Sequence, residues 1–199
     1  MTPAAAVVLA AGASRRMGRA KALLPWRGRP FVAHAVALAS AAHCDPIVVV
    51  TDAIPLPAAA LAGARTVHNH EWARGQMSSV QVGAASVPAG SAMLLLTVDR
   101  PHIRADTVEA LMRAWRDEPE CVWQPEFAGR RGHPLVFPCG VVARIVAAPP
   151  GATLRDVLEE TEVATLRRRL PCEDAAVLDN IDRPEDLARL PGVLLSDPK

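Results

Sequence analysis

A cluster of cationic side chains follows a turn of small residues near the start of the sequence. Residues 10–14 read Ala-Ala-Gly-Ala-Ser, and the next seven positions contain four cations, Arg15, Arg16, Arg19 and Lys21. Small side chains allow backbone N–H groups to approach a ligand closely, and such a turn after a strand gathers unpaired amides that bind anions. We therefore expect this stretch to hold the phosphates of a nucleoside triphosphate.

The spacing within this stretch excludes two commoner phosphate-binding loops. A Walker A loop needs Gly-Lys-Ser/Thr, whereas Gly18 is followed by Arg19, Ala20 and Lys21. A dinucleotide-binding fingerprint needs G-x-G-x-x-G, and Ser14 stands where its second glycine is required.

A second candidate for chemistry is Asp99, which directly follows the apolar run 92–98. A carboxylate at the carboxyl end of a central strand lies where open α/β sheets bind ligands. Mg²⁺ is commonly held by one or two carboxylates together with substrate phosphates. Asp99 fits such a metal ligand, and taken alone it fits equally well a residue that only ends a strand and forms a turn.

Residues 9–21, LAAGASRRMGRAK, resemble the L-A-A-G-x-S-x-R-M-G-x-x-K signature of the MobA-like nucleotidyltransferases. They are most similar to the molybdenum cofactor cytidylyltransferase branch, because the guanylyltransferase branch usually carries L-A-G-G. The resemblance implies that Arg16 and Lys21 neutralise the α-phosphate and the leaving pyrophosphate, and that Gly12 lets the backbone approach the nucleotide.

The resemblance extends to two aspartates further along the chain. Residues 98–101 are similar to the family's V-D-x-P, whose aspartate binds the metal, although the family often carries an uncharged residue in place of Arg100. That arginine either meets an anionic substrate or points to solvent. Residues 179–187, DNIDRPEDL, resemble D-I-D-T-P-E-D-L and imply a second metal ligand, either Asp182 or Asn180. A role of Asp182 as a helix N-cap alone is the other reading.

Two further stretches resemble the remainder of the family's site. Residues 69–80 are similar to a loop near the nucleotide base and the substrate, and residues 131–134, Arg-Gly-His-Pro, are similar to a turn near the second substrate. The likeness as a whole assigns these residues to nucleotide binding: Leu9, Ala10, Ala11, Gly12, Ser14, Arg16, Lys21, Gly75, Ser78 and Ser79. It assigns these to substrate binding: Arg100, Arg131, Gly132 and His133.

The function implied by the resemblance is a Mg²⁺- or Mn²⁺-dependent transfer of a nucleoside monophosphate. CTP is the implied donor and the terminal phosphate of molybdopterin, or of its molybdenum form, the implied acceptor, with Arg16, Lys21 and Asp99 as the catalytic residues. A molybdoenzyme or its chaperone is the implied recipient of the product. The alternatives are a nucleotidyltransferase acting on a sugar or polyol phosphate, and a nucleotide- or pterin-binding protein without turnover.

Strand-like and helix-like stretches alternate along the chain, which favours an α/β fold. We expect a single-domain, Rossmann-like three-layer sandwich with a mostly parallel sheet over residues 1–199, with a loose tail after about residue 191. Expected strands cover residues 4–9, 46–51, 65–67, 92–98, 121–124, 135–137, 164–170 and 176–178. Expected helices cover residues 31–42, 57–62, 78–86 (with Ser78 as its cap), 105–116, 140–147 and 153–160, with a last one opening at Pro184.

Composition narrows the class of protein. A formal charge of +1 leaves no basic field, so nucleic acid is not an expected partner. The four cysteines are widely spaced without a C-x-x-C pair, which favours reduced thiols in the cytoplasm over a disulfide framework or a zinc site. Residues 1–13 are apolar but lack the basic start of a signal peptide. No apolar run reaches the length of a membrane span, so no membrane association is expected.

Overall fold

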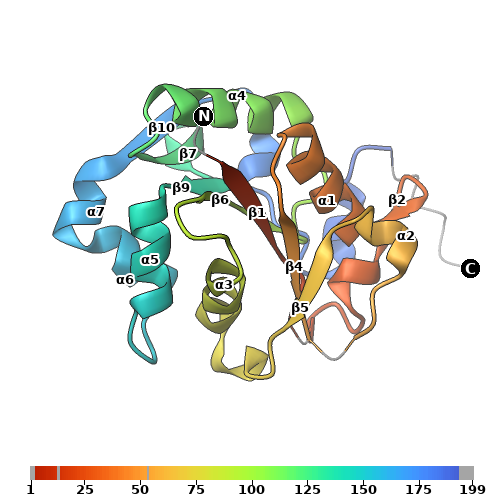
Figure 1. Ribbon diagram of the computed structural model, residues 1–199. Coiled ribbons are helices and arrows are strands. Elements are labelled where there is room, and N and C mark those ends of the chain that lie inside the picture. Colours follow the sequence, from red (N-terminus) through yellow and green to blue (C-terminus); the bar gives the residue numbers. More distant parts are fainter. Residues whose placement is uncertain (1–2, 13, 53, 193–199) are drawn as a thin grey trace, which may run out of the picture.

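The computed structural model describes residues 3–12, 14–52 and 54–192, and a mixed sheet forms its centre (Figure 1). The strand order is β10-β7-β9-β6-β1-β4-β5, with β8 paired to β7. The strands of this sheet are β1 (Ala4–Leu9), β4 (Ile47–Thr51), β5 (Arg65–His68), β6 (Ala92–Thr97), β7 (Val122–Phe127), β8 (Arg130–Arg131), β9 (Leu135–Phe137) and β10 (Arg167–Pro171). A separate hairpin pairs β2 (Pro25–Trp26) with β3 (Arg29–Pro30).

The middle of the sheet is parallel, as expected from the sequence. Strand β1 pairs in parallel with β4 and with β6, and β4 pairs in parallel with β5. Strand β9 runs antiparallel to β6 and β7. The central strands are almost wholly apolar. Helices cover both faces of the sheet, so the side chains on either face are shielded from water.

Helices form the two outer layers. On one face, Ala6 and Val8 of β1 belong to the core that includes α1 and α4, and on the other, Val7 and Leu9 join α3 and α5 (Figure 1). This arrangement confirms the predicted three-layer sandwich. The helices are α1 (Phe31–Ala41), α2 (Ala58–Leu61), α3 (Gln76–Ala85), α4 (Ala105–Asp117), α5 (Cys139–Ala147), α6 (Leu154–Glu159) and α7 (Thr161–Leu166), with 3-10 turns η1 (Lys21–Leu23), η2 (Trp72–Arg74), η3 (Ala175–Leu178) and η4 (Pro184–Arg189).

The sequence-based prediction was wrong in two places of the second half. Residues 164–166 form the end of α7 instead of a strand, because the Ala164 N–H donates to the carbonyl of Glu160 in a helical turn, and β10 begins only at Arg167. Residues 176–178 form η3 instead of a strand. The carboxylate of Asp174 accepts from the Ala176 N–H and caps that turn. A short apolar run fits a buried strand and a helical turn equally well.

Two observations concern the predictions about the membrane and the tail. Among the described residues, no helix combines the length and the apolar character needed to cross a bilayer. The predicted loose tail falls largely on residues 193–199, which lie outside the described residues.

Candidate functional site

The carboxyl ends of β1 and β6 open into a cavity of about 590 Å³. In the parallel ladder, Leu9 lies opposite Thr97, and the Val98 N–H donates to the carbonyl of Leu9 at 3.2 Å. The loop after β1 and the turn containing Asp99 therefore emerge side by side, at the edge where α/β sheets bind ligands. The described residues lining the cavity include Leu9, Ala10, Ala11, Gly12, Ser14, Arg16, Lys21, Trp72, Ala73, Gly75, Gln76, Ser79, Thr97, Asp99 and Asp182.

Hydrogen bonds hold the loop after β1 in shape. The hydroxyl of Ser14 accepts a hydrogen bond from the backbone N–H of Lys21 at 3.1 Å. This bond joins the two ends of the cationic stretch. Gly12 has a φ of 144°, in the region that favours glycine, and its N–H donates to the carboxylate of Asp52 at 3.0 Å. The sequence reasoning missed Asp52. Its position directly after β4, at the same sheet edge, was the signal that could have found it.

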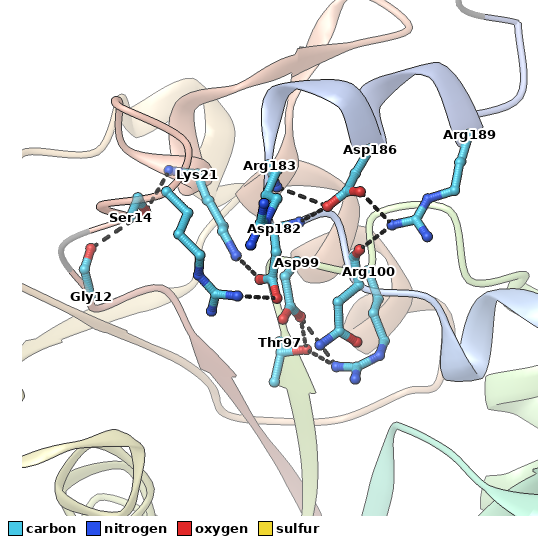
Figure 2. A network of polar contacts seen from close by, with 12 residues as sticks. Gly12, Ser14, Lys21, Thr97, Asp99, Arg100, Asp182, Arg183, Asp186 and Arg189 are labelled. Atoms are coloured by element: carbon cyan, nitrogen blue, oxygen red, sulfur yellow. Dashed lines mark hydrogen bonds and ion pairs between the residues drawn. The ribbon is translucent and has the colours of Figure 1, made fainter.

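Both predicted phosphate-binding cations pair with one carboxylate, and Figure 2 shows Lys21 pointing toward it. Lys21 donates to Oδ1 of Asp182, and Arg16 lies 3.5 Å from Oδ2 of the same residue. The Lys21 hydrogen bond is the main cause that lowers the pKa of Asp182, although partial burial acts in the opposite direction. A negatively charged ligand arriving in the cavity would compete with Asp182 for these two cations.

Asp182 reaches the cavity because the C-terminal segment is tied to the turn after β6. The Ile181 N–H donates to the carbonyl of Asp99 at 2.8 Å, so the side chains of Asp99 and Asp182 line the same space. The helix-cap reading of Asp182 does not match the contacts, because the carboxylate of Asp186 accepts from the N–H groups of Asp182 and Arg183. Asn180 is absent from the cavity wall formed by the described residues.

The carboxylate pair fits a hard divalent cation. Within the described residues, no group of three or more His, Cys, Asp or Glu side chains could hold a metal ion. Two carboxylates suit Mg²⁺ or Mn²⁺ when waters and substrate phosphates complete the coordination shell. Asp99 and Asp182 are the side chains that would hold such an ion.

The loop before α3 supplies another wall of the cavity. Gly75 and Ser79 line it, and the amide of Asn69 donates to the hydroxyls of both Ser78 and Ser79 at 2.9 Å. The helix starts at Gln76 and not at Ser78, because Gly75 with a φ of 108° ends the preceding turn and caps α3. The hydroxyl of Ser78 instead donates to the carbonyl of Gly75 at 2.8 Å, within the first helical turn.

The residues that were predicted to bind the acceptor substrate are not among the described residues that line the cavity. Arg131 is exposed, and Gly132 packs against Val177 so closely that an added Cβ would meet its carbonyl oxygen at 2.6 Å. Burial lowers the pKa of His133 to about 4, and the positive charge of Arg100 acts in the same direction. Arg100 donates to Thr97 and to Asp99. Of the four predicted substrate-binding residues, the structure thus brings Arg100 and His133 near Asp99.

An open α/β sheet with a small-residue loop, clustered cations and two carboxylates at one edge defines a nucleotide-binding protein of the nucleotidyltransferase fold. The sequence model of the MobA-like NTP transferase domain matches residues 6–166. The chain belongs to this family, as its opening motif indicated. Asp182 lies beyond the matched residues.

Two curated proteins illustrate the range of relatives. The chain is 33% identical to nicotine blue oxidoreductase of Paenarthrobacter nicotinovorans, over 92% of this chain and 94% of that protein. It is 25% identical to molybdenum cofactor cytidylyltransferase of Escherichia coli, over 90% and 91% of the two chains. Membership of the family therefore leaves the reaction and the acceptor to be tested.

Among solved structures, the chain is similar to Rv0371c of Mycobacterium tuberculosis in complex with manganese. The TM-score is 0.73 at 22% identity, and the match covers 95% of this chain and 98% of the other. This likeness supports the fold alone.

Proposed function

We propose that the protein transfers a nucleoside monophosphate, CMP, from CTP to the terminal phosphate of a molybdopterin-type acceptor and releases pyrophosphate. The observation that carries the proposal is the convergence of Arg16, Lys21, Asp99 and Asp182 on one cavity of nucleotide size. The family supports nucleotidyl transfer, and the acceptor and the base rest on the opening motif.

The reaction needs alignment and charge stabilisation more than a strong base. An ionised acceptor phosphate is already a nucleophile, so no covalent intermediate with the protein is required. Lys21 and Arg16 would leave Asp182 to bind the α-phosphate and the leaving pyrophosphate. A Mg²⁺ or Mn²⁺ ion held by Asp99 and Asp182 would supply further positive charge to the phosphates. Gly75 and Ser79 would line the nucleotide side of the cavity.

The test is pyrophosphate release from each of the four NTPs, with and without molybdenum cofactor, in Mg²⁺ and in EDTA. We expect release with CTP only when both the cofactor and the metal are present. Release that requires a sugar or polyol phosphate would move the activity to that acceptor class. No release with any acceptor, together with nucleotide binding, would indicate a binding protein without turnover.

A second candidate is an oxidation–reduction reaction, favoured by the 33% identity to nicotine blue oxidoreductase along nearly the whole chain. Its sequence argument is weaker, because the loop after β1 departs from the dinucleotide-binding fingerprint. Consumption of NADH or NADPH with nicotine blue, without pyrophosphate release, would favour this candidate. We also predict a single domain over residues 1–199 and a cytoplasmic location. A molybdoenzyme or its chaperone is the predicted partner, and neither nucleic acid nor a membrane is expected as one.

A further inference from the structure

We propose that Arg100 is a resident counter-cation of Asp99, which fixes one oxygen of the carboxylate and weakens its affinity for a free divalent cation. The inference rests on the metal-binding role of Asp99 in the proposed function. It makes Arg100 a positioning residue in place of a substrate-binding one.

The contacts of Arg100 all point toward the end of β6. Its Nη1 donates to the hydroxyl of Thr97 at 2.9 Å and to Oδ1 of Asp99 at 3.2 Å. The Thr97 hydroxyl also donates to this Oδ1. Within the described residues, every polar contact of the Asp99 side chain falls on Oδ1, so Oδ2 is the oxygen left to a ligand (Figure 2).

Arg100 lies behind Asp99 and away from the substrate space. Its side chain is only 10% exposed, and Thr97 and Asp99 line the cavity wall whereas Arg100 is absent from its described part. Its Nε is buried without a hydrogen-bond partner in the described part of the chain. The guanidinium is therefore enclosed by protein and held by two residues of the cavity wall.

The two carboxylates of the site differ in the cations beside them. Asp182 pairs with Arg16, whose side chain is 65% exposed and can move to a ligand, and with the more enclosed Lys21. Asp99 pairs with Arg100, and the low exposure of the Arg100 side chain keeps its charge beside Asp99. Two like charges a few ångströms apart repel several-fold more strongly near a protein surface than in bulk water, and a divalent ion doubles the effect. A free metal ion is thus disfavoured until triphosphate brings its own negative charge.

The test is titration of the protein with Mn²⁺ alone, followed by electron paramagnetic resonance of the free ion. We expect Arg100→Gln to bind Mn²⁺ about tenfold more tightly than the unmodified protein in the absence of nucleotide. Arg100→Lys keeps the positive charge, so this variant should bind Mn²⁺ as weakly as the unmodified protein. Thr97→Val removes the two hydrogen bonds of the Thr97 hydroxyl, to Asp99 and from Arg100, but no charge, and should give no gain in affinity.

Two further variants make the result decisive. The double variant Asp99→Asn/Arg100→Gln should lose the gain, which assigns it to Asp99. Arg100→Met, with a side chain of similar length, replaces Arg100→Gln if the latter unfolds. An affinity unchanged in the uncharged variants, or a gain that survives Asp99→Asn, would overturn the proposal. Because the titration requires no turnover, it can be read even if pyrophosphate release is never detected.

Discussion

Lys21 and Asp182 form an ion pair across 161 positions of the sequence. The pair joins the loop after β1 to the segment before η4, and only 16% of the Lys21 side chain is exposed. This low exposure places the amino group of Lys21 at the cavity wall, where it can exchange Asp182 for an incoming phosphate. The cation proposed for the phosphates and the carboxylate proposed for the metal are therefore held in contact before any ligand binds.

Replacement of Lys21 by alanine should lower kcat about 10²–10³-fold, with a small effect on KM. The physical reason is that charge moves onto the leaving pyrophosphate during the reaction, so a preorganised cation acts mainly in the transition state. Steady-state kinetics of pyrophosphate release measure both constants. Arg19→Ala is the matched control, since this cation is exposed and lies in the same loop. An effect of Lys21→Ala confined to KM would mean uniform binding of substrate and transition state.

Asp99→Asn should lower turnover at saturating Mg²⁺ by at least 10²-fold, because a neutral amide is a poor substitute for a carboxylate ligand. The amide oxygen can still accept the hydrogen bonds from Thr97 and Arg100, so the fold should be kept, but the loss of the ion pair with the enclosed Arg100 should lower the thermal unfolding temperature. Circular dichroism checks the fold, and Asp117→Asn at an exposed position of α4 is the control. Full activity of Asp99→Asn would remove this residue from the metal site.

The central fold could be predicted because its strands carry their own signal. Buried parallel strands such as β4 and β6 read as unbroken apolar runs, and the capping box of Thr153 and Asp156 marks the start of α6. Other stretches of the second half carried no such signal. Residues 164–166 and 176–178 are helical because of particular backbone and side-chain contacts, which a three-residue pattern does not encode.

The candidate site was predictable only as far as its motifs extended. The loop after β1 and Asp99 were predicted because each stands in a recognisable motif, whereas Asp182 was predicted only as an alternative to Asn180. Their mutual arrangement depends on two contacts that no motif encodes. Leu9 of β1 lies opposite Thr97 of β6, and the Ile181 N–H donates to the carbonyl of Asp99. The Asp52 contact to Gly12 was missed, because it joins residues 40 positions apart without a shared motif.

Stability should fall as the pH decreases from about 6.5 to about 4. The ordinary pKa of histidine is 6.5, and burial lowers the pKa of His133 to about 4 in the folded state. Between these values the unfolded chain takes up a proton that the folded protein does not, so the free energy of unfolding decreases with falling pH. Below about pH 4 both states are protonated and this contribution is constant. The total effect of His133 is about 3 kcal/mol.

Urea unfolding at a series of pH values measures this dependence. His133→Gln should show a shallower slope than the unmodified protein between pH 6.5 and 4, whatever its stability at neutral pH. The remaining slope includes His102, whose pKa is also lowered by burial and partly restored by Asp179. Equal slopes for His133→Gln and the unmodified protein would contradict the assignment.

CTP should be preferred over GTP, and Ala11 is the residue on which this prediction rests. Ala11 lines the cavity beside Gly12 and packs against the apolar core below the sheet. Its methyl group would crowd a bicyclic base and leave room for a pyrimidine near the backbone amides. One methyl group discriminates by only about 1–3 kcal/mol, so other cavity residues must share the task.

The values of kcat/KM for CTP and GTP with one acceptor measure the preference. Ala11→Gly should narrow the ratio without abolishing turnover, and Ala20→Gly, which is not among the described residues that line the cavity, is the control. A ratio at or below one in the unmodified protein would exclude cytidylyl transfer, and a ratio unaffected by Ala11→Gly would show that another residue selects the base.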